Sequence, residues 1–101
     1  MQCYEWQRSM IRSFRHKGLR RFFESSDRRG VPPESADRLR RMLDRLEAAT
    51  VPQDMNLPGY TFHPLGGDRK GAYAVTVTGN RRLTFEFDDK GAKKVNLEDY
   101  H

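Results

Sequence analysis

The segment from Tyr60 to Phe87 constrains the fold most, because apolar and polar residues alternate along it. The apolar members of its two clearest runs are Tyr73, Val75 and Val77, then Leu83, Phe85 and Phe87. A period of two is typical of half-buried strands that have one apolar and one polar face. The segment therefore predicts three consecutive strands joined by polar, basic connections.

Gly79 and Asn80 lie between the two runs, and both tolerate positive φ, so the runs are expected to form a hairpin. A two-residue loop would pair Val77 with Arg82 and mix the two faces. A three-residue loop over residues 79–81 pairs Thr78 with Arg82, Val77 with Leu83, Val75 with Phe85, and Tyr73 with Phe87. Because a slip of one residue turns every side chain to the other face, we predict the three-residue loop, with Arg82 on the polar face.

Helical spacing of apolar residues predicts two helices before these strands. The first covers residues 16–24, with Leu19, Phe22 and Phe23 on its apolar side. The second begins at Pro32 and Pro33, and its apolar stripe consists of Ala36, Leu39, Met42, Leu43 and Leu46. Its arginine-rich side is interpreted as a solvated face with i,i+4 pairs Glu34–Arg38 and Asp37–Arg41, in preference to a helix that binds a nucleic-acid groove.

The remaining elements complete an α+β plan. Residues 10–14 predict a short strand, residues 51–58 a linker, and residues 93–97 a last strand before the tail. This order favours two N-terminal helices packed on one face of a mainly antiparallel, curved sheet of about five strands. Residues 10–101 are expected to form a single domain, and residues 1–9, which show no period, a non-core N-terminal extension.

Charge and cysteine content narrow the function classes. Nineteen Lys and Arg residues against fourteen acids give a net charge of +5. Such a balance in a small domain indicates a polyanionic partner, with RNA or DNA first, although solubility alone is the simpler explanation. Cys3 is the single cysteine, so no internal disulfide or cysteine-based zinc site can form. With no apolar run near the roughly 20 residues that span a bilayer, and no signal-peptide pattern, the chain is expected to be cytoplasmic and to bind no membrane.

The polar face of the predicted sheet is where chemistry is expected. By parity His63 shares this face with Thr76, Thr78 and Arg82, although toward the opposite strand end from the tail. The connection over residues 65–71 is glycine-rich and basic, so backbone amides, Arg69 and Lys70 can approach a phosphate there. It lacks P-loop spacing, which argues against binding of a nucleoside triphosphate.

The tail Asp99-Tyr100-His101 supplies an acid, a phenol and an imidazole, and any face-matched register returns it beside Arg81 and Arg82. Strict alternation places Tyr100 on the open face and the other two on the opposite one, so the last strand is expected to end or bulge before the tail. His63, Asp99 and His101 could also form a metal set, but they lack the usual close ligand spacing.

These residue types suit cleavage of RNA without a metal or other cofactor. Imidazoles and carboxylates can take the proton from a 2′-hydroxyl and give one to the leaving oxygen. An arginine can stabilise charge on the phosphate oxygens, and Tyr100 can stack on a base.

Several short motifs together resemble one family. They are His63-Pro64-Leu65 followed by Gly67-Asp68-Arg69 and Gly71, Asn80-x-Arg82 with Thr84-Phe85, the ending Glu98-Asp99-Tyr100-His101, and the opening from Met10 to Leu19. Each motif is weak alone, but together they run over residues 10–101. The chain resembles HigB-type toxins, a branch of the RelE/ParE toxin superfamily.

The resemblance implies a RelE-like fold and a specific activity. Such toxins are bacterial endoribonucleases that cut mRNA in the ribosomal A site, contact rRNA and arrest growth. A HigA-like helix-turn-helix antitoxin neutralises them, and operator DNA is bound only indirectly, through the antitoxin complex. The implied catalytic residues are His63, Arg82, Asp99, Tyr100 and His101, with Arg69, Lys70, Asn80 and Arg81 binding RNA or phosphate.

Two positions depart from the family pattern. Gly66 stands where members often have lysine, so Arg69 or Lys70 would have to supply the cation. Arg81 stands where tryptophan is frequent. Two other functions stay open: a ParE-like toxin that poisons a protein target such as gyrase, and a plain RNA-binding module. A pure binder has no need of acid–base groups on its open face, and the chain lacks the paired aromatics of an RNA-recognition motif.

Overall fold

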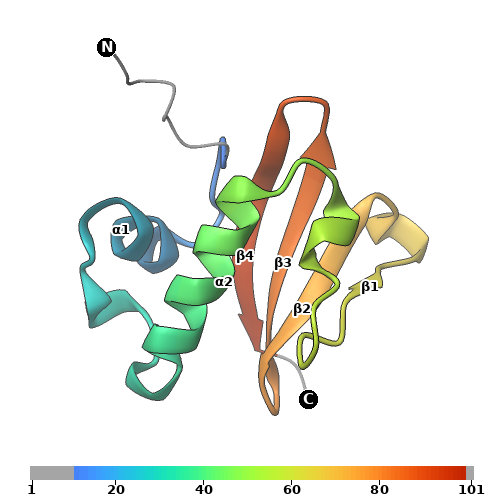
Figure 1. The fold of residues 1–101 in the computed structure, drawn as a ribbon. Coiled ribbons are helices and arrows are strands. Elements are labelled where there is room, and N and C mark those ends of the chain that lie inside the picture. The colour runs from blue at the N-terminus through green and yellow to red at the C-terminus, as the bar shows by residue number, and fades with distance from the viewer. Residues whose placement is uncertain (1–10, 100–101) are drawn as a thin grey trace.

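Two helices pack against a four-stranded antiparallel sheet in the computed structural model, which describes residues 11–99 (Figure 1). The elements are α1 (Lys17–Ser25), α2 (Ala36–Ala48), β1 (His63–Pro64), β2 (Ala72–Thr78), β3 (Arg81–Asp88) and β4 (Gly91–Asp99). The strands lie side by side in sequence order. The predicted α+β class is confirmed, with four strands instead of about five. The proposed extension, residues 1–9, lies outside the described residues.

The missing fifth strand corresponds to the segment before α1. Residues 11–15 run beside the outer edge of β4, where Arg12 N donates to Ala92 O at 2.9 Å and Arg15 N to Val95 O at 2.8 Å. Phe14 and Val95 form the one parallel bridge recorded there. The predicted strand is thus reduced to a bridge, but it still covers backbone groups that an edge strand would otherwise expose.

The predicted helices are confirmed with small shifts at their ends. α1 begins after His16 and ends at a left-handed Ser26, whose N–H bonds to Phe22 O. The chain makes a 3₁₀ turn over Pro33–Ser35 before α2 starts at Ala36. Among the described residues, neither helix is long and apolar enough to cross a bilayer.

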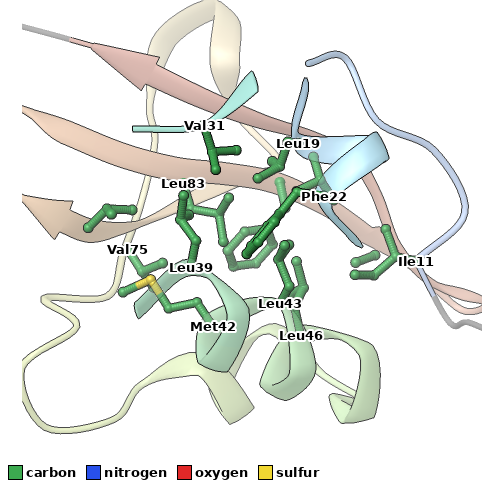
Figure 2. Close-up of a cluster of buried hydrophobic side chains, with 14 of the residues drawn as sticks. Ile11, Leu19, Phe22, Val31, Leu39, Met42, Leu43, Leu46, Val75 and Leu83 are labelled. Atoms are coloured by element: carbon green, nitrogen blue, oxygen red, sulfur yellow. The ribbon is translucent and has the colours of Figure 1, made fainter. Parts of the chain in front are cut away.

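The core lies between α2 and the sheet. All five predicted stripe residues of α2 are fully buried: Ala36, Leu39, Met42, Leu43 and Leu46. They join Leu19 and Phe22 of α1 and Val75 and Leu83 of the sheet in one cluster (Figure 2). Met55, from the segment predicted as a plain linker, is also fully buried, so the linker contributes to the core as well.

The charged side of α2 pairs with other parts of the chain. Asp37 accepts from Arg28 at 2.8 Å, and Glu34 accepts from Arg81 of β3 at 3.1 Å. Arg38 donates to the carbonyl oxygen of Gly59 and to that of Thr76. These partners differ from the predicted i,i+4 pairs, because the neighbouring loops bring competing charges and carbonyls within reach of the helix.

The register of the β2–β3 hairpin corrects one prediction. Val75 pairs with Leu83 and Thr76 with Arg82, while Thr78 pairs with Arg81, so the loop has two residues and not three. Neither Gly79 nor Asn80 has positive φ. The ladder shifts between Thr76 and Thr78, and this bulge absorbs the odd residue. The predicted faces are therefore confirmed although the predicted partners are two residues off.

The contact between α1 and the following loop gives a stability prediction. A Cβ on Gly18 would lie 2.4 Å from the carbonyl oxygen of Gly30. Alanine is favoured over glycine inside a helix by about 1 kcal/mol, but overpacking against backbone costs about 1–3 kcal/mol. We expect Gly18→Ala to lower the free energy of unfolding, measured by chemical denaturation. Gly66→Ala is the control, since nothing lies within 4 Å of its Cβ position. A Gly18→Ala protein as stable as the control would contradict the close approach.

The cap of α1 gives a pH prediction. Nδ1 of His16 accepts from Leu19 N at 3.0 Å, and burial lowers the pKa of His16 from its ordinary 6.5. The unfolded state then binds a proton more readily than the folded one, so this stabilisation is complete above about pH 6.5 and declines as the pH falls toward the folded pKa. His16→Asn replaces the accepting ring nitrogen by an amide oxygen, which can accept at the N-cap and does not titrate. Between about pH 7.5 and about pH 5.5 the wild type should lose stability relative to this variant, by up to the ~1 kcal/mol of a cap. Parallel pH dependences of the two proteins would exclude this role.

Candidate active site

The sheet face opposite the helices carries two neighbouring rows of paired side chains. His63 pairs with Ala74, which pairs with Thr84 of β3. The next row, two residues along β2 and β3, joins Thr76 to Arg82. Side chains of directly paired residues share a face, so His63 and Arg82 lie on the same face, one row apart. His63 lies opposite Ala74, near the start of β2 and away from the Arg81–Asp99 pair at the hairpin end, as expected.

The ring of His63 is oriented by the chain just before β1. Its Nδ1 lies 2.9 Å from the carbonyl oxygen of Thr61. A carbonyl oxygen only accepts, so Nδ1 carries the hydrogen and the neutral ring keeps its lone pair on Nε2. Thr61 has φ 50°, an uncommon conformation for a β-branched residue. Sequence reasoning did not single out Thr61, since nothing in its residue type signals this conformation.

A carboxylate at the end of β4 joins the cations of this face. Glu98 is paired with Arg82 across the β3–β4 ladder, and the two side chains are 3.4 Å apart. Arg69, from the connection between β1 and β2, donates to both carboxylate oxygens at 2.9 and 2.5 Å. The hydrogen bonds from Arg69 are the main reason that the pKa of Glu98 falls to about 2. Sequence analysis named Glu98 only in the ending motif, and its link to Arg69 was missed.

A hollow of about 260 Å³ lies next to this pair. Arg15, Arg69 and Lys94 line it, together with the acids Asp68, Glu86 and Glu98. Lys70 follows the turn Gly67–Arg69 and is exposed.

The other predicted residues lie at the hairpin end, on the side of the helices. Arg81 pairs with Asp99 in the ladder and with Glu34 ahead of α2. Asn80 donates to Asp99 at 2.7 Å. Arg81 and Asp99 therefore belong to the face opposite to that of His63 and Arg82. The expected return of Asp99 to the hairpin is confirmed.

β4 bulges before the tail, as expected. The β3–β4 ladder shifts between the pairs Thr84–Asn96 and Glu86–Lys93, because β4 has one more residue than β3 between them. From Asn96 the strand continues in register through Asp99, so this bulge does not bring Asp99 to the face of Arg82. Tyr100 and His101 lie outside the described residues. Within residues 11–99 no group of three or more His, Cys, Asp or Glu side chains is placed to hold a metal ion; the alternative metal set included His101 and is not tested by this.

Comparison with known proteins places the chain. Residues 12–101 match the family model described as "RelE-like toxin of type II toxin-antitoxin system HigB". The chain is 44% identical over 92 residues to Endoribonuclease HigB of Proteus vulgaris. The alignment covers 91% of this chain and 100% of that protein. The two helices packed against an antiparallel sheet agree with this match. The chain therefore belongs to the RelE-like HigB toxins of type II toxin–antitoxin systems.

Proposed function

We propose that this chain is the toxin of a type II toxin–antitoxin system, and that it acts as a metal-independent endoribonuclease on mRNA in the ribosomal A site. The observation that carries the proposal is that one sheet face, opposite the helices, holds both an oriented imidazole, His63, and a strand-borne guanidinium, Arg82. The first can move a proton and the second can stabilise anionic phosphate oxygens. The name of the relative, an endoribonuclease, supports the same reaction class.

The proposed reaction is a transesterification within the RNA. A base removes the proton of the 2′-hydroxyl, whose oxygen attacks phosphorus, and the bond from phosphorus to the 5′-oxygen breaks as that oxygen gains a proton. Nε2 of His63 is suited to one of these transfers, because Nδ1 is engaged by Thr61. Arg82 would hold the non-bridging oxygens, on which charge grows in the transition state.

The tail would supply the second proton-transfer group. We propose that His101 and Asp99 share the acid–base work with His63, and that Tyr100 stacks on a base. Asp99 is held by Asn80 at the hairpin end, on the face opposite to His63 and Arg82, so its proposed part in the reaction requires that the RNA extend around the hairpin end of the sheet. The ribosome would align the mRNA over the open face, and the exposed cations Arg69 and Lys70, with Arg81 at the hairpin end, would contact RNA phosphates.

The proposed partners follow from the family. We propose a HigA-like helix-turn-helix antitoxin as the neutralising partner, contact with operator DNA only through that complex, and action in the cytoplasm, where ribosomes are. A net charge of +5 supports association with rRNA and mRNA.

The histidines give the direct test of the reaction. Single substitutions His63→Ala and His101→Ala should each reduce cleavage of mRNA on programmed ribosomes by about 10²–10⁴-fold, the usual contribution of a proton-transfer group. Primer extension on a translated mRNA, with and without ribosomes, measures the cuts. His16→Asn is the matched control, because it removes a histidine that caps α1 and lies outside the proposed machinery. Growth arrest by a well-expressed His63→Ala/His101→Ala double variant would reject the nuclease and favour a toxin that poisons a protein such as gyrase.

Arg82 gives a second test, since its pairing with Glu98 offers a purely structural explanation. Lysine keeps the charge but lacks the planar fork of donors. If Arg82 stabilises the transition state, Arg82→Lys should lower single-turnover cleavage by at least about 10-fold, with a much smaller change in ribosome binding. An ion pair without a catalytic role would be worth about 0–1 kcal/mol of stability. Equal losses in binding and cleavage, or none in either, would remove Arg82 from the catalytic set.

A further inference from the structure

Glu98 is the centre of a hydrogen-bonded cluster on the open face. Its carboxylate accepts two bonds from Arg69 and one from Arg82, as described above. Thr84 Oγ1 donates to Oε2 at 3.0 Å, and Asn96 Nδ2 lies 3.4 Å from the same oxygen. The two oxygens of one acid are thus surrounded by five donor groups of four side chains from the β1–β2 connection and from β3 and β4.

The same donors suit a phosphodiester. A guanidinium fork binds two oxygens of a phosphate as it binds two oxygens of a carboxylate. The Thr84 hydroxyl and the second guanidinium, Arg82, would face the same anion. Glutamate is ionised at neutral pH, and the hydrogen bonds from Arg69 lower the pKa of Glu98 further, to about 2, so a negative charge occupies this place in the free protein.

Arg69 is the member of the cluster that can change partner at least cost. It ends the turn Gly67–Arg69, which lies between glycines at positive φ, Gly67 and Gly71. Its side chain is 42% exposed, against 20% for Glu98 and 19% for Arg82. A partly exposed ion pair contributes little net stability, so exchange of one anion for another on Arg69 need not disturb the fold.

We propose that Arg69, Arg82 and Thr84 form a binding site for an RNA phosphodiester, and that the Glu98 carboxylate occupies this site in the free protein and is displaced from Arg69 by the RNA. The adjoining hollow of about 260 Å³ accommodates the displaced carboxylate or the sugar of the bound nucleotide. Arg69 then supplies the cation that Gly66 lacks. This inference rests on the proposed function, because it takes RNA as the ligand.

The test measures binding without cleavage. The probe is a single-stranded RNA oligonucleotide, 2′-O-methylated at every position, so that no 2′-hydroxyl can attack. Fluorescence anisotropy at several salt concentrations gives its Kd for the wild type, Glu98→Gln, Arg69→Ala and the double variant. Glu98→Gln should bind about 3- to 10-fold more tightly, with a steeper salt dependence, because one more cation is available to release counterions. Arg69→Ala should bind more weakly, and the gain from Glu98→Gln should disappear in its background.

Glu86→Gln is the matched control. Glu86 lines the same hollow and is 3.8 Å from Lys94; it acts on Arg69 through its charge, whereas Glu98 also accepts two hydrogen bonds from Arg69. It changes the net charge by the same amount as Glu98→Gln. Equal binding by Glu98→Gln and Glu86→Gln, no binding by Glu98→Gln at any salt concentration, or a gain that persists without Arg69 would overturn the proposal.

A second measurement uses the wild type, in case Glu98→Gln folds poorly. The NMR signal of the Arg69 Nε–H group, assigned by its loss in Arg69→Ala, should shift as the methylated RNA is added, and an unchanged signal at saturation would overturn the proposal. If the Arg69 signal does not shift but the wild type still cleaves mRNA on ribosomes, the phosphate site is refuted and the proposed nuclease is not. Tighter binding by Glu98→Gln in a protein that cuts no mRNA would support the site and refute the proposed nuclease.

Discussion

The pairing of β2 with β3 is the constraint on which the rest of the molecule depends. Val75 opposite Leu83 places apolar side chains under α2, and by the same parity Thr76 opposite Arg82 places polar ones on the other face. A shift by one residue would turn Arg82 toward the helices and Leu83 toward the other face. The candidate site is therefore fixed by the same register that forms the core, and the bulge at Val77 keeps that register where the hairpin turns.

The features of the fold that could be predicted are those that depend on periodicity. The buried stripe of α2 and the faces of β2 and β3 follow from spacing alone. The exact partners do not, because registers that differ by two residues keep the same faces and a bulge leaves no mark on a period of two. Pairs such as Glu34–Arg81 were likewise out of reach, since they depend on where a loop returns and not on spacing along a helix.

The candidate site was also predictable only in part. His63 and Arg82 could be assigned to one face by alternation, and the return of Asp99 to the hairpin follows from any matched register. The orientation of His63 depends on the positive φ of Thr61, which no pattern indicates. The role of Glu98 required the length of β4: once that strand extends through Asp99, Glu98 falls opposite Arg82, whereas a strand that ends at residue 97 leaves it in the tail.

The cluster around Glu98 shows how one acid can serve both folding and binding. Arg82 is mostly buried, and a cation removed from water needs a compensating anion. In the free chain Glu98 supplies this anion. It also holds the Arg69 side chain over the sheet, and without this contact the long side chain would be mobile in solvent. An RNA phosphate that binds here supplies the same negative charge beside the arginines. The arginines are therefore ordered before the ligand arrives, and the cost of desolvating them is met in folding, so that binding requires an exchange of anions and little rearrangement of the chain.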